Sequence, residues 1–262
     1  LRGPVQSRYN LVARGKGVLR VDAARLKAIN LLPGMAVFTL PEGLVVVPGK
    51  TVAGVKITPV AVAAATLAEA EAVAAGDPVV AVRPFLPRAV GVVSTEGMAE
   101  RVRARFRETV ERKVGWFGGR VVGFAEPAAE AAAVAAAIEG LLGDGAEVIL
   151  AAGGNTIDPL DPTLLALDRV GAELVRFGAP AHPGSMFWLA YRGATPIFNL
   201  ASCSMYSKAT VADLVLPWIM AGERVTPDHL AALGYGGLLD RGMGFRFPPY
   251  DQETADEEED EG

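Results

Sequence analysis

The chain has 262 residues, of which 51% are apolar and 21% are charged, with 25 Lys and Arg against 30 Asp and Glu. So much apolar side chain can form a sizeable core, which excludes a globally disordered chain. Eight of the acidic residues stand in the last twelve positions, 251–262. The remainder carries 25 positive and 22 negative charges and lacks the basic excess that a nucleic-acid-binding surface would show.

Other classes of protein are excluded by single features of the sequence. One cysteine, Cys203, rules out an internal disulfide framework and a thiolate zinc cluster, and two histidines argue against a His-rich metal centre. No apolar run approaches the roughly 18 residues that a membrane span requires. The first 17 residues are basic but lack the apolar stretch of a secretory signal. We therefore expect a cytoplasmic protein with no membrane partner.

The first part of the chain, 1–87, has the pattern of a β-rich subdomain. Pro-Gly turns separate its β-branched segments, and Asp22 is a suitable N-cap for a helix at 23–30. An Ala-rich helix is expected at 61–75, ending at Gly76. The predicted strands are Val18–Val21, Ala36–Leu40, Leu44–Val47 and Thr51–Thr58.

From residue 88 strands and helices alternate. The helix predicted at 98–114 places apolar residues four apart, a second should begin at Pro127 and run to about Leu142, and a third should begin at Pro162 and end at Gly171. A last helix is expected at 204–221. The predicted strands are Ala89–Thr95, Arg120–Phe124, Glu147–Ala152, Glu173–Phe177, Met186–Tyr191 and Pro196–Leu200.

This alternation predicts an α/β fold, a three-layer, doubly wound and mostly parallel sheet, over 88–222. A C-terminal extension at 223–250 and a disordered acidic tail at 251–262 should follow. Ligands of such sheets bind outside the carboxyl ends of the strands, which directs attention to the loops at 94–97, 153–162, 180–185 and 199–204.

Several residues of these loops have both a structural and a functional interpretation. Asp161 should cap the helix that begins at Pro162, and its second oxygen could still contact a ligand. Cys203 and His182 could form a thiol–imidazole pair, although a lone cysteine is more often a small buried hydrophobe. The Arg and Lys residues of the helix at 98–114 are interpreted as a solvated face.

The loop sequences resemble those of the molybdopterin-binding domain family, which includes molybdopterin adenylyltransferases, molybdenum-inserting transferases and gephyrin-type proteins. GGNTIDPLDPT at 153–163 is similar to the family's GGTGLGPRD loop, with Gly153, Gly154, Pro159 and Asp161 in matching places. STEG at 94–97 is similar to the family's STGDE-like loop, His182-Pro183-Gly184 to KPG, and Leu200-Ala201-Ser202 to LPG.

A closer likeness is to bacterial molybdopterin-binding proteins that sometimes carry a fused nucleotidyltransferase domain. Their C-A-R-S-P-K stretch resembles CSMYSK at 203–208, and their preceding region resembles VVPGKTVAGVKITPVAV at 46–62. The sequence departs from the family at Asp158, which replaces a loop Gly, at Ala201-Ser202, which replaces Pro-Gly, and at Met205, which replaces Arg.

The resemblance implies a protein of molybdenum cofactor biosynthesis that binds molybdopterin or its adenylylated form, with Mg²⁺ as a second cofactor and a dimeric or trimeric assembly. It implies Asp161 as the metal ligand and, with Asp158, as the catalytic carboxylates of a nucleotidyl-transfer or molybdate-insertion reaction. A non-catalytic carrier or regulator and a pyrophosphatase-like hydrolase stay open as alternatives. The implied binding residues are Thr95, Glu96, Gly153, Gly154, Asn155, Thr156, His182, Pro183, Gly184, Ser185, Ser202, Cys203, Ser204 and Lys208.

Overall fold

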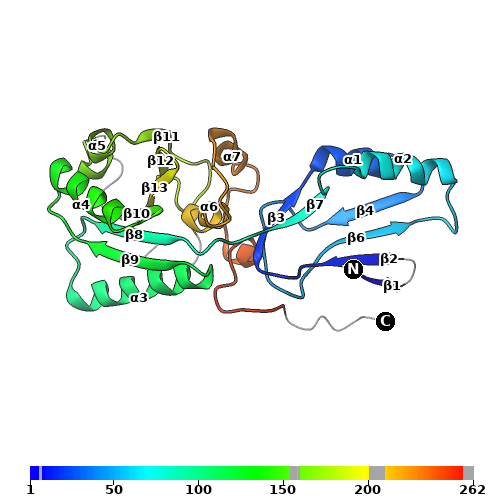
Figure 1. Cartoon of the computed structure of the whole chain (residues 1–262), viewed down its shortest axis with the longest axis horizontal. Coiled ribbons are helices and arrows are strands. Elements are labelled where there is room, and N and C mark those ends of the chain that lie inside the picture. Colours follow the sequence, from blue (N-terminus) through cyan, green and yellow to red (C-terminus); the bar gives the residue numbers. More distant parts are fainter. Residues whose placement is uncertain (6–7, 154–157, 159, 201–209, 256–262) are drawn as a thin grey trace. The chain divides into compact units, whose positions relative to one another are not determined.

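The computed structural model describes residues 1–5, 8–153, 158, 160–200 and 210–255. These residues form two compact units (Figure 1). Unit 1 contains residues 1–85 and the described residues 251–255, and unit 2 contains residues 86–250. The division falls two residues before the one expected from sequence. In the described part of the chain, no helix has the length and apolar character that a membrane span needs.

Unit 1 is built from two small antiparallel sheets and two helices. The first sheet has the order β1-β2-β6-β4 and the second the order β5-β3-β7. A cluster around Leu19, Val46 and Val52 fills its core. The elements are β1 (Arg2–Val5), β2 (Arg8–Val12), β3 (Gly17–Val21), α1 (Ala23–Asn30), β4 (Met35–Thr39), β5 (Val45–Val46), β6 (Thr51–Ile57), α2 (Ala64–Ala74) and β7 (Val80–Pro84).

The helices of unit 1 are fixed by Asp22 and Arg25. The Asp22 carboxylate caps α1 by accepting the Arg25 backbone N–H at 3.0 Å, as the sequence predicts. The Arg25 guanidinium then donates to three carbonyls at the end of α2, those of Val73, Ala75 and Asp77, at 2.6–2.9 Å. These bonds satisfy carbonyls that a helix end leaves without partners, and they join α1 to α2.

Unit 2 contains a six-stranded sheet of order β11-β12-β13-β10-β8-β9. The pairs β13–β10, β10–β8 and β8–β9 are parallel, whereas β12 is antiparallel to both neighbours. The mixed α/β fold with a mostly parallel sheet, predicted from sequence, is confirmed. Its strands are β8 (Ala89–Ser94), β9 (Arg120–Ala125), β10 (Val148–Ala152), β11 (Glu173–Phe177), β12 (Trp188–Arg192) and β13 (Thr195–Leu200).

Helices pack on both faces of this sheet. Successive side chains of β10 point to opposite faces and contact different helices. Ile149 and Ala151 pack in one cluster with residues of α4 and α5, while Leu150 faces α3 and α6. Figure 1 shows α3 and α4 on opposite sides of the strands. Burial on both faces explains the continuous apolar runs of β8 and β10. The helices are α3 (Glu100–Trp116), α4 (Ala131–Gly143), α5 (Pro162–Arg169), α6 (Val211–Met220) and α7 (Pro227–Ala232), followed by a 3₁₀ helix at Arg241–Arg246.

Two expectations from sequence need correction. Pro127 does not begin a helix: a turn in which Glu130 N–H donates to Ala128 O precedes α4, which begins at Ala131. Residues 251–255, assigned to a disordered tail, instead belong to unit 1. A backbone hydrogen bond and an ion pair hold them there, whereas 256–262 lie outside the described residues. Residues 204–209 of the last predicted helix are outside them too.

Candidate functional site

The strand-end edge, defined here as the edge of the sheet at the carboxyl ends of β8, β10 and β13, carries the candidate loops. Ala152 pairs with Ser94 on one side and Leu200 on the other, so these three strands end level with one another. Because β12 runs antiparallel to β13, the loop at 178–187 that enters β12 lies at the same edge. Loops far apart in sequence therefore converge, as expected for a doubly wound sheet.

The loop after β8 and the start of the loop after β10 are in contact. Thr95 N–H donates to Ala152 O at 3.1 Å. Gly153 has a φ of +117°, and a Cβ on it would lie 2.7 Å from Thr95 Oγ1 and 2.8 Å from Glu96 Cγ. Only glycine fits this approach. Gly153 therefore makes room for loop 94–97, and its contact with a ligand stays a prediction.

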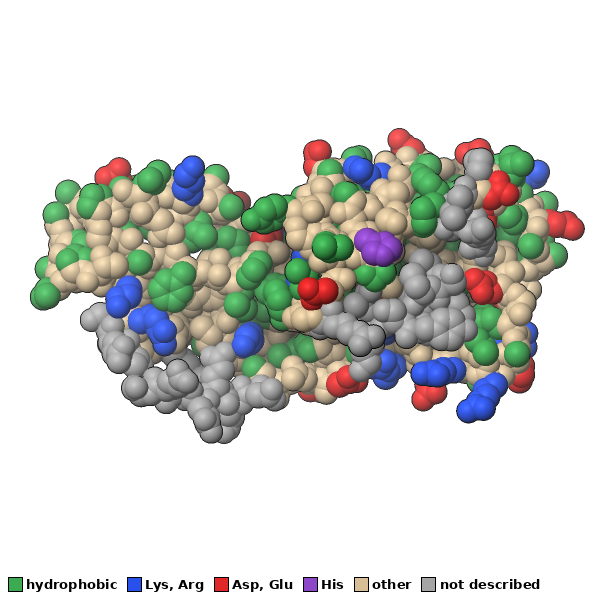
Figure 2. Space-filling model, turned by 180° about the vertical axis from the view of Figure 1, so that it is seen from behind, with side chains coloured by type: hydrophobic (Ala, Val, Ile, Leu, Met, Phe, Trp, Pro, Cys, Tyr) green, Lys and Arg blue, Asp and Glu red, His purple; other side chains and the backbone are tan. Residues whose placement is uncertain are grey.

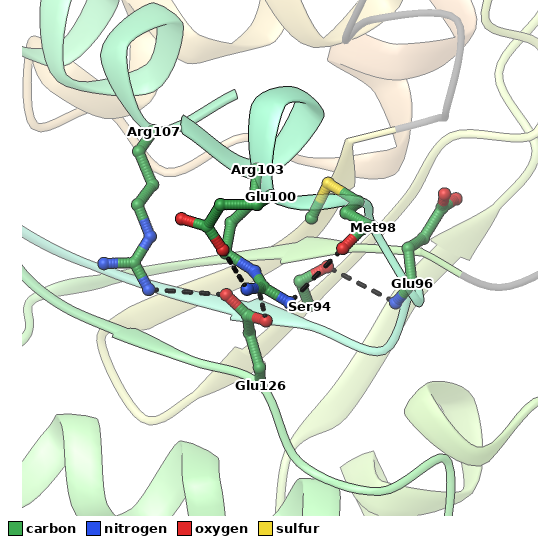
Figure 3. Close-up of polar contacts among 7 residues, drawn as sticks. All are labelled: Ser94, Glu96, Met98, Glu100, Arg103, Arg107 and Glu126. Carbon is green, nitrogen blue, oxygen red and sulfur yellow. Dashed lines mark hydrogen bonds and ion pairs between the residues drawn. The ribbon is translucent and has the colours of Figure 1, made fainter. Parts of the chain in front are cut away.

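Arg103 fastens the end of loop 94–97 to α3 and to the end of β9 (Figure 3). Its guanidinium forms ion pairs with Glu100 at 2.7 Å and Glu126 at 2.8 Å and donates to Met98 O at 3.3 Å. Arg107 also reaches Glu126, at 3.3 Å. Both arginines stay partly exposed, and Glu126, just after β9, supplies them with a partner that the helix sequence does not reveal. The expectation of a solvated basic face was wrong at Lys113, whose side chain is only 14% exposed because it pairs with the buried Asp213.

Glu96 is the acidic residue of loop 94–97. In Figure 3 its carboxylate is directed away from the guanidinium groups of Arg103 and Arg107. Its backbone N–H donates to Ser94 Oγ at 3.4 Å. Within the described ranges, no residue forms a hydrogen bond or an ion pair with the Glu96 carboxylate.

Asp161 caps α5, as the sequence predicts. Its Oδ1 accepts the Thr163 N–H at 2.8 Å, Pro162 occupies the first helical turn, and the residue is only 5% exposed. Asp158 forms the preceding turn: its carbonyl accepts the Asp161 N–H at 3.0 Å, and its Oδ1 accepts the Leu160 N–H at 2.8 Å. Among the described residues, none donates to Asp161 Oδ2. Both carboxylates thus accept backbone hydrogen bonds through Oδ1, and Asp161 Oδ2 has no donor among the residues that the structure describes.

The loop at 178–187 is held at its centre and at its end. His182 is exposed, and its backbone exchanges hydrogen bonds of 2.8 Å with Gly237 O and Leu239 N–H. Gly184, with a φ of +107°, is needed because a Cβ there would lie 2.9 Å from the Val211 nitrogen at the start of α6. Pro183 lies between them, and Ser185 next to Gly184 is exposed.

Asn199 joins this loop to β13 and was not singled out from the sequence. It is 2% exposed, accepts the Trp188 N–H at 2.7 Å through Oδ1, and donates to Met186 O at 3.1 Å through Nδ2. A buried amide with a matched donor and acceptor rigidifies its surroundings, because leaving either group unpaired is costly. An Asn inside an apolar strand, as in PIFNL, is the signal that could have revealed it.

Asp213 organises the start of α6. Its Oδ2 accepts the Thr210 N–H at 3.3 Å and lies 3.1 Å from the Thr210 hydroxyl, while Oδ1 lies 2.5 Å from Lys113 Nζ. Tyr250 donates its hydroxyl to the same Oδ1 at 2.8 Å. Burial raises the pKa of Tyr250 well above its ordinary value of 10.0, and the neighbouring Asp213 charge raises it further.

The remaining predicted site residues lie outside the described residues. They are Gly154, Asn155, Thr156, Ser202, Cys203, Ser204 and Lys208. In the ranges that the structure describes, no group of three or more His, Cys, Asp and Glu side chains is arranged to hold a metal ion.

No protein-family model and no curated protein matches the sequence. Among solved structures, the chain is similar to the molybdopterin biosynthesis MoeA protein from Pyrococcus horikosii, with 15% identity, 80% of this chain and 67% of that chain covered, and a TM-score of 0.39. For a putative molybdenum cofactor biosynthesis protein from Corynebacterium diphtheriae the identity is 14%, the match covers 55% of this chain and 97% of that chain, and the TM-score is 0.37. For a structure of MogA the identity is 22%, the match covers 50% of this chain and 92% of that chain, and the TM-score is 0.30. At such TM-scores these likenesses do not assign a function to this chain.

Proposed function

We propose that the protein binds molybdopterin or its adenylylated form at the strand-end edge and acts in molybdenum cofactor biosynthesis. One observation carries the proposal: Gly153, from the loop that resembles the family's central motif, touches Thr95 and Glu96, from the loop that resembles its first motif. These loops are separated by more than fifty residues in the chain. Their contact supports the idea that the resembling motifs form one site.

The described groups at this edge suit the two ends of such a ligand. A pterin ring presents N–H donors, and the Glu96 carboxylate, which has no partner among the described residues, is an acceptor-only group that can receive them. A phosphate needs donors, which the Thr95 hydroxyl and the exposed Ser185 hydroxyl can supply. Gly153 keeps the backbone free of a side chain between the two loops.

Mg²⁺ fits this donor set as a bridge to a substrate phosphate. The ion is commonly held by one or two carboxylates together with phosphates and waters, so a complete protein cage is not required. Asp161 would hold it through Oδ2, since Oδ1 caps α5, with Asp158 as the neighbouring carboxylate. The ion would neutralise phosphate charge.

Copurification tests the binding function. The full chain, produced in a molybdopterin-producing host, should release a fluorescent oxidised pterin on acid oxidation. Glu96→Gln should lower the pterin content about tenfold, because a hydrogen bond to a charged group contributes about 1.5–3 kcal/mol. Glu108→Gln, at an exposed position of α3, is the matched control and should retain the pterin. Absence of pterin from the unmodified protein would contradict the proposal.

Within this role we favour transfer of a nucleotide to the pterin phosphate or insertion of molybdate; a carrier without turnover is the second candidate. The departures at Asp158 and Met205 favour the carrier, because a loop glycine and an arginine of the family are missing there. Incubation with Mg²⁺ and either ATP plus molybdopterin or adenylylated molybdopterin plus molybdate separates the two. Release of pyrophosphate or AMP that depends on the pterin indicates an enzyme, and binding without release indicates a carrier. Hydrolysis of the nucleotide without pterin would instead indicate a pyrophosphatase.

A further inference from the structure

The first sheet of unit 1 is basic, although the body of the chain as a whole is nearly neutral. Residues 1–85 contain ten Lys and Arg but only five Asp and Glu, and none of these acidic residues stands in β1, β2, β4 or β6. The expectation of no nucleic-acid partner was drawn from the charge of residues 1–250 taken together, which averages over this local excess. The electrostatic potential at the first sheet is therefore dominated by basic side chains.

Five residues of β2, β4 and β6 share one face of this sheet, here named the basic face: Arg8, Asn10, Phe38, Gly54 and Lys56. Arg8 stands opposite Lys56, and Asn10 stands opposite Gly54. Phe38 stands opposite Gly54 on the other side of β6. Opposite residues of neighbouring strands point to the same face, and so do residues two positions apart along one strand. The face thus carries a row with two cations beside a row with an aromatic ring.

The Phe38 ring lies across Gly54. A Cβ on Gly54 would lie 2.3 Å from Phe38 Cε2 and 2.6 Å from Phe38 Cζ, so the ring occupies the space of the missing side chain. Gly54 is buried as a result, whereas Phe38 is 46% exposed. The ring therefore covers the glycine and still presents apolar aromatic surface to solvent. A nucleic-acid base can stack on such a surface, because every base has a planar π-face.

Arg8 and Lys56 have no hydrogen-bond or ion-pair partner among the residues that the structure describes, and Arg8 is exposed. The acidic Glu253 pairs with Lys16, which follows β2 at the end away from Arg8. Figure 2 shows Lys and Arg side chains of unit 1 near one another, beside exposed apolar side chains and with no acidic side chain between them. The two cations can thus pair with an anionic ligand.

The spacing of the two rows suits a nucleotide unit. Alternate residues of a strand are about 6.4–6.8 Å apart, so Lys56 stands about that far from the glycine beneath the Phe38 ring. In a nucleotide one sugar separates the phosphate from the base, which is a distance of the same order. Lys and Arg side chains bind phosphates, and the Asn10 amide offers a donor and an acceptor to the edge of a base.

We propose that the basic face of unit 1 binds single-stranded nucleic acid, with a base stacked on Phe38 and phosphates held by Arg8 and Lys56. A duplex fits poorly, because its bases stack on one another and do not reach the ring. Phosphate binding releases counterions, so the affinity depends on salt, and stacking makes the affinity tolerant of base sequence. This inference is independent of the proposed pterin site, which lies in unit 2.

Fluorescence anisotropy of the full chain with a labelled oligothymidylate of about twelve nucleotides tests the proposal. At about 50 mM salt, Arg8→Gln and Lys56→Gln should each weaken binding severalfold, and each should reduce the dependence of log affinity on log salt by about 0.7. Phe38→Leu should weaken binding at least about fivefold, because leucine still covers Gly54 but has no aromatic face. Phe38→Tyr keeps that face and should retain the affinity.

Lys27→Gln is the matched control for the charge variants. It removes the same charge at an exposed position of α1, away from the strands of the basic face, and should leave the affinity within about twofold. A duplex of the same length should bind more weakly than the single strand and should not respond to Phe38→Leu. Circular dichroism checks the fold of each variant; if Phe38→Leu unfolds, the two charge variants measured against Lys27→Gln decide.

Three results would overturn the proposal. The first is no binding of the oligonucleotide to the unmodified chain at about 50 mM salt. The second is equal affinity of a folded Phe38→Leu variant and the unmodified chain, which would leave the ring as a cover for Gly54 only. The third is equal weakening by Lys27→Gln and Lys56→Gln, which would indicate a diffuse attraction of unit 1 for anions.

Discussion

Lys113 Nζ lies 2.5 Å from Asp213 Oδ1, and the two residues are a hundred positions apart in the chain. Their side chains are 14% and 3% exposed, so the pair is nearly removed from water. Asp213 also accepts hydrogen bonds from Thr210 and Tyr250. One carboxylate therefore joins α3, the start of α6 and the end of unit 2.

Loss of the lysine should leave a buried and poorly compensated charge. We expect Lys113→Met to lower the free energy of unfolding by about 3–5 kcal/mol, whereas Lys113→Met combined with Asp213→Asn should recover part of that loss. Arg192→Met, which removes an exposed pair with Glu139, should cost no more than about 1 kcal/mol. Urea denaturation followed by circular dichroism measures all three. Equal losses of unfolding free energy in Lys113→Met and Arg192→Met would contradict a buried pair at Lys113.

Tyr250 should make the protein sensitive to alkaline pH. Its folded pKa is raised above the unfolded value of 10.0, so the native state keeps a proton that the unfolded state releases. The stability from this group is fully present below pH 10 and is lost as pH rises from there through the folded pKa. Chemical denaturation at pH 9 and above should show that the free energy of unfolding declines as pH rises, and Tyr250→Phe should reduce this decline. An unchanged decline in Tyr250→Phe would assign it to other groups.

Gly153→Ala should disturb both stability and the candidate site. The positive φ costs an alanine about 1–2 kcal/mol, and displacement of Thr95 and Glu96 adds about 1–3 kcal/mol. Gly145→Ala is the control, since Gly145 has a φ of +88° but open space around it, and should show the first cost only. Thermal unfolding compares the two, and copurified pterin should fall only for Gly153→Ala. Equal losses of stability in Gly153→Ala and Gly145→Ala would mean that loop 94–97 shifts to make room for the added methyl group.

Asp161 can be tested for its two roles separately. Asp161→Asn should leave stability nearly unchanged, because Asn caps a helix about as well as Asp, while Asp161→Ala should cost about 1 kcal/mol. If Oδ2 holds Mg²⁺ on a phosphate, Asp161→Asn should weaken Mg²⁺-dependent binding of adenylylated molybdopterin in calorimetric titration. Asp158→Gly serves as the neighbouring comparison. The same affinity in all variants would leave both carboxylates purely structural.

The sequence predicted the helices, strands and caps that depend on residues close together in the chain. The strands and helices of unit 2 follow from hydrophobic period, and the caps at Asp22 and Asp161 follow from one residue and its neighbours. The strand β7 was not predicted, because its partner β3 lies some sixty residues away and Pro84 ends it. The Lys113–Asp213–Tyr250 cluster was not predicted for the same reason, because no local sequence pattern marks residues that meet only after the chain has folded.

The chain crosses from unit 1 to unit 2 after Phe85 and returns after Tyr250. Unit 2 is thus an uninterrupted insertion, whereas unit 1 is assembled from two separate pieces of sequence. A protease that cuts only the first crossing would separate residues 1–85 from a product that carries unit 2 and residues 251–262, whereas a cut at the second crossing would release only residues 251–262. A gene fragment for 86–250 encodes all of unit 2, but separate expression of unit 1 with residues 251–262 would require a new joint between positions 85 and 251.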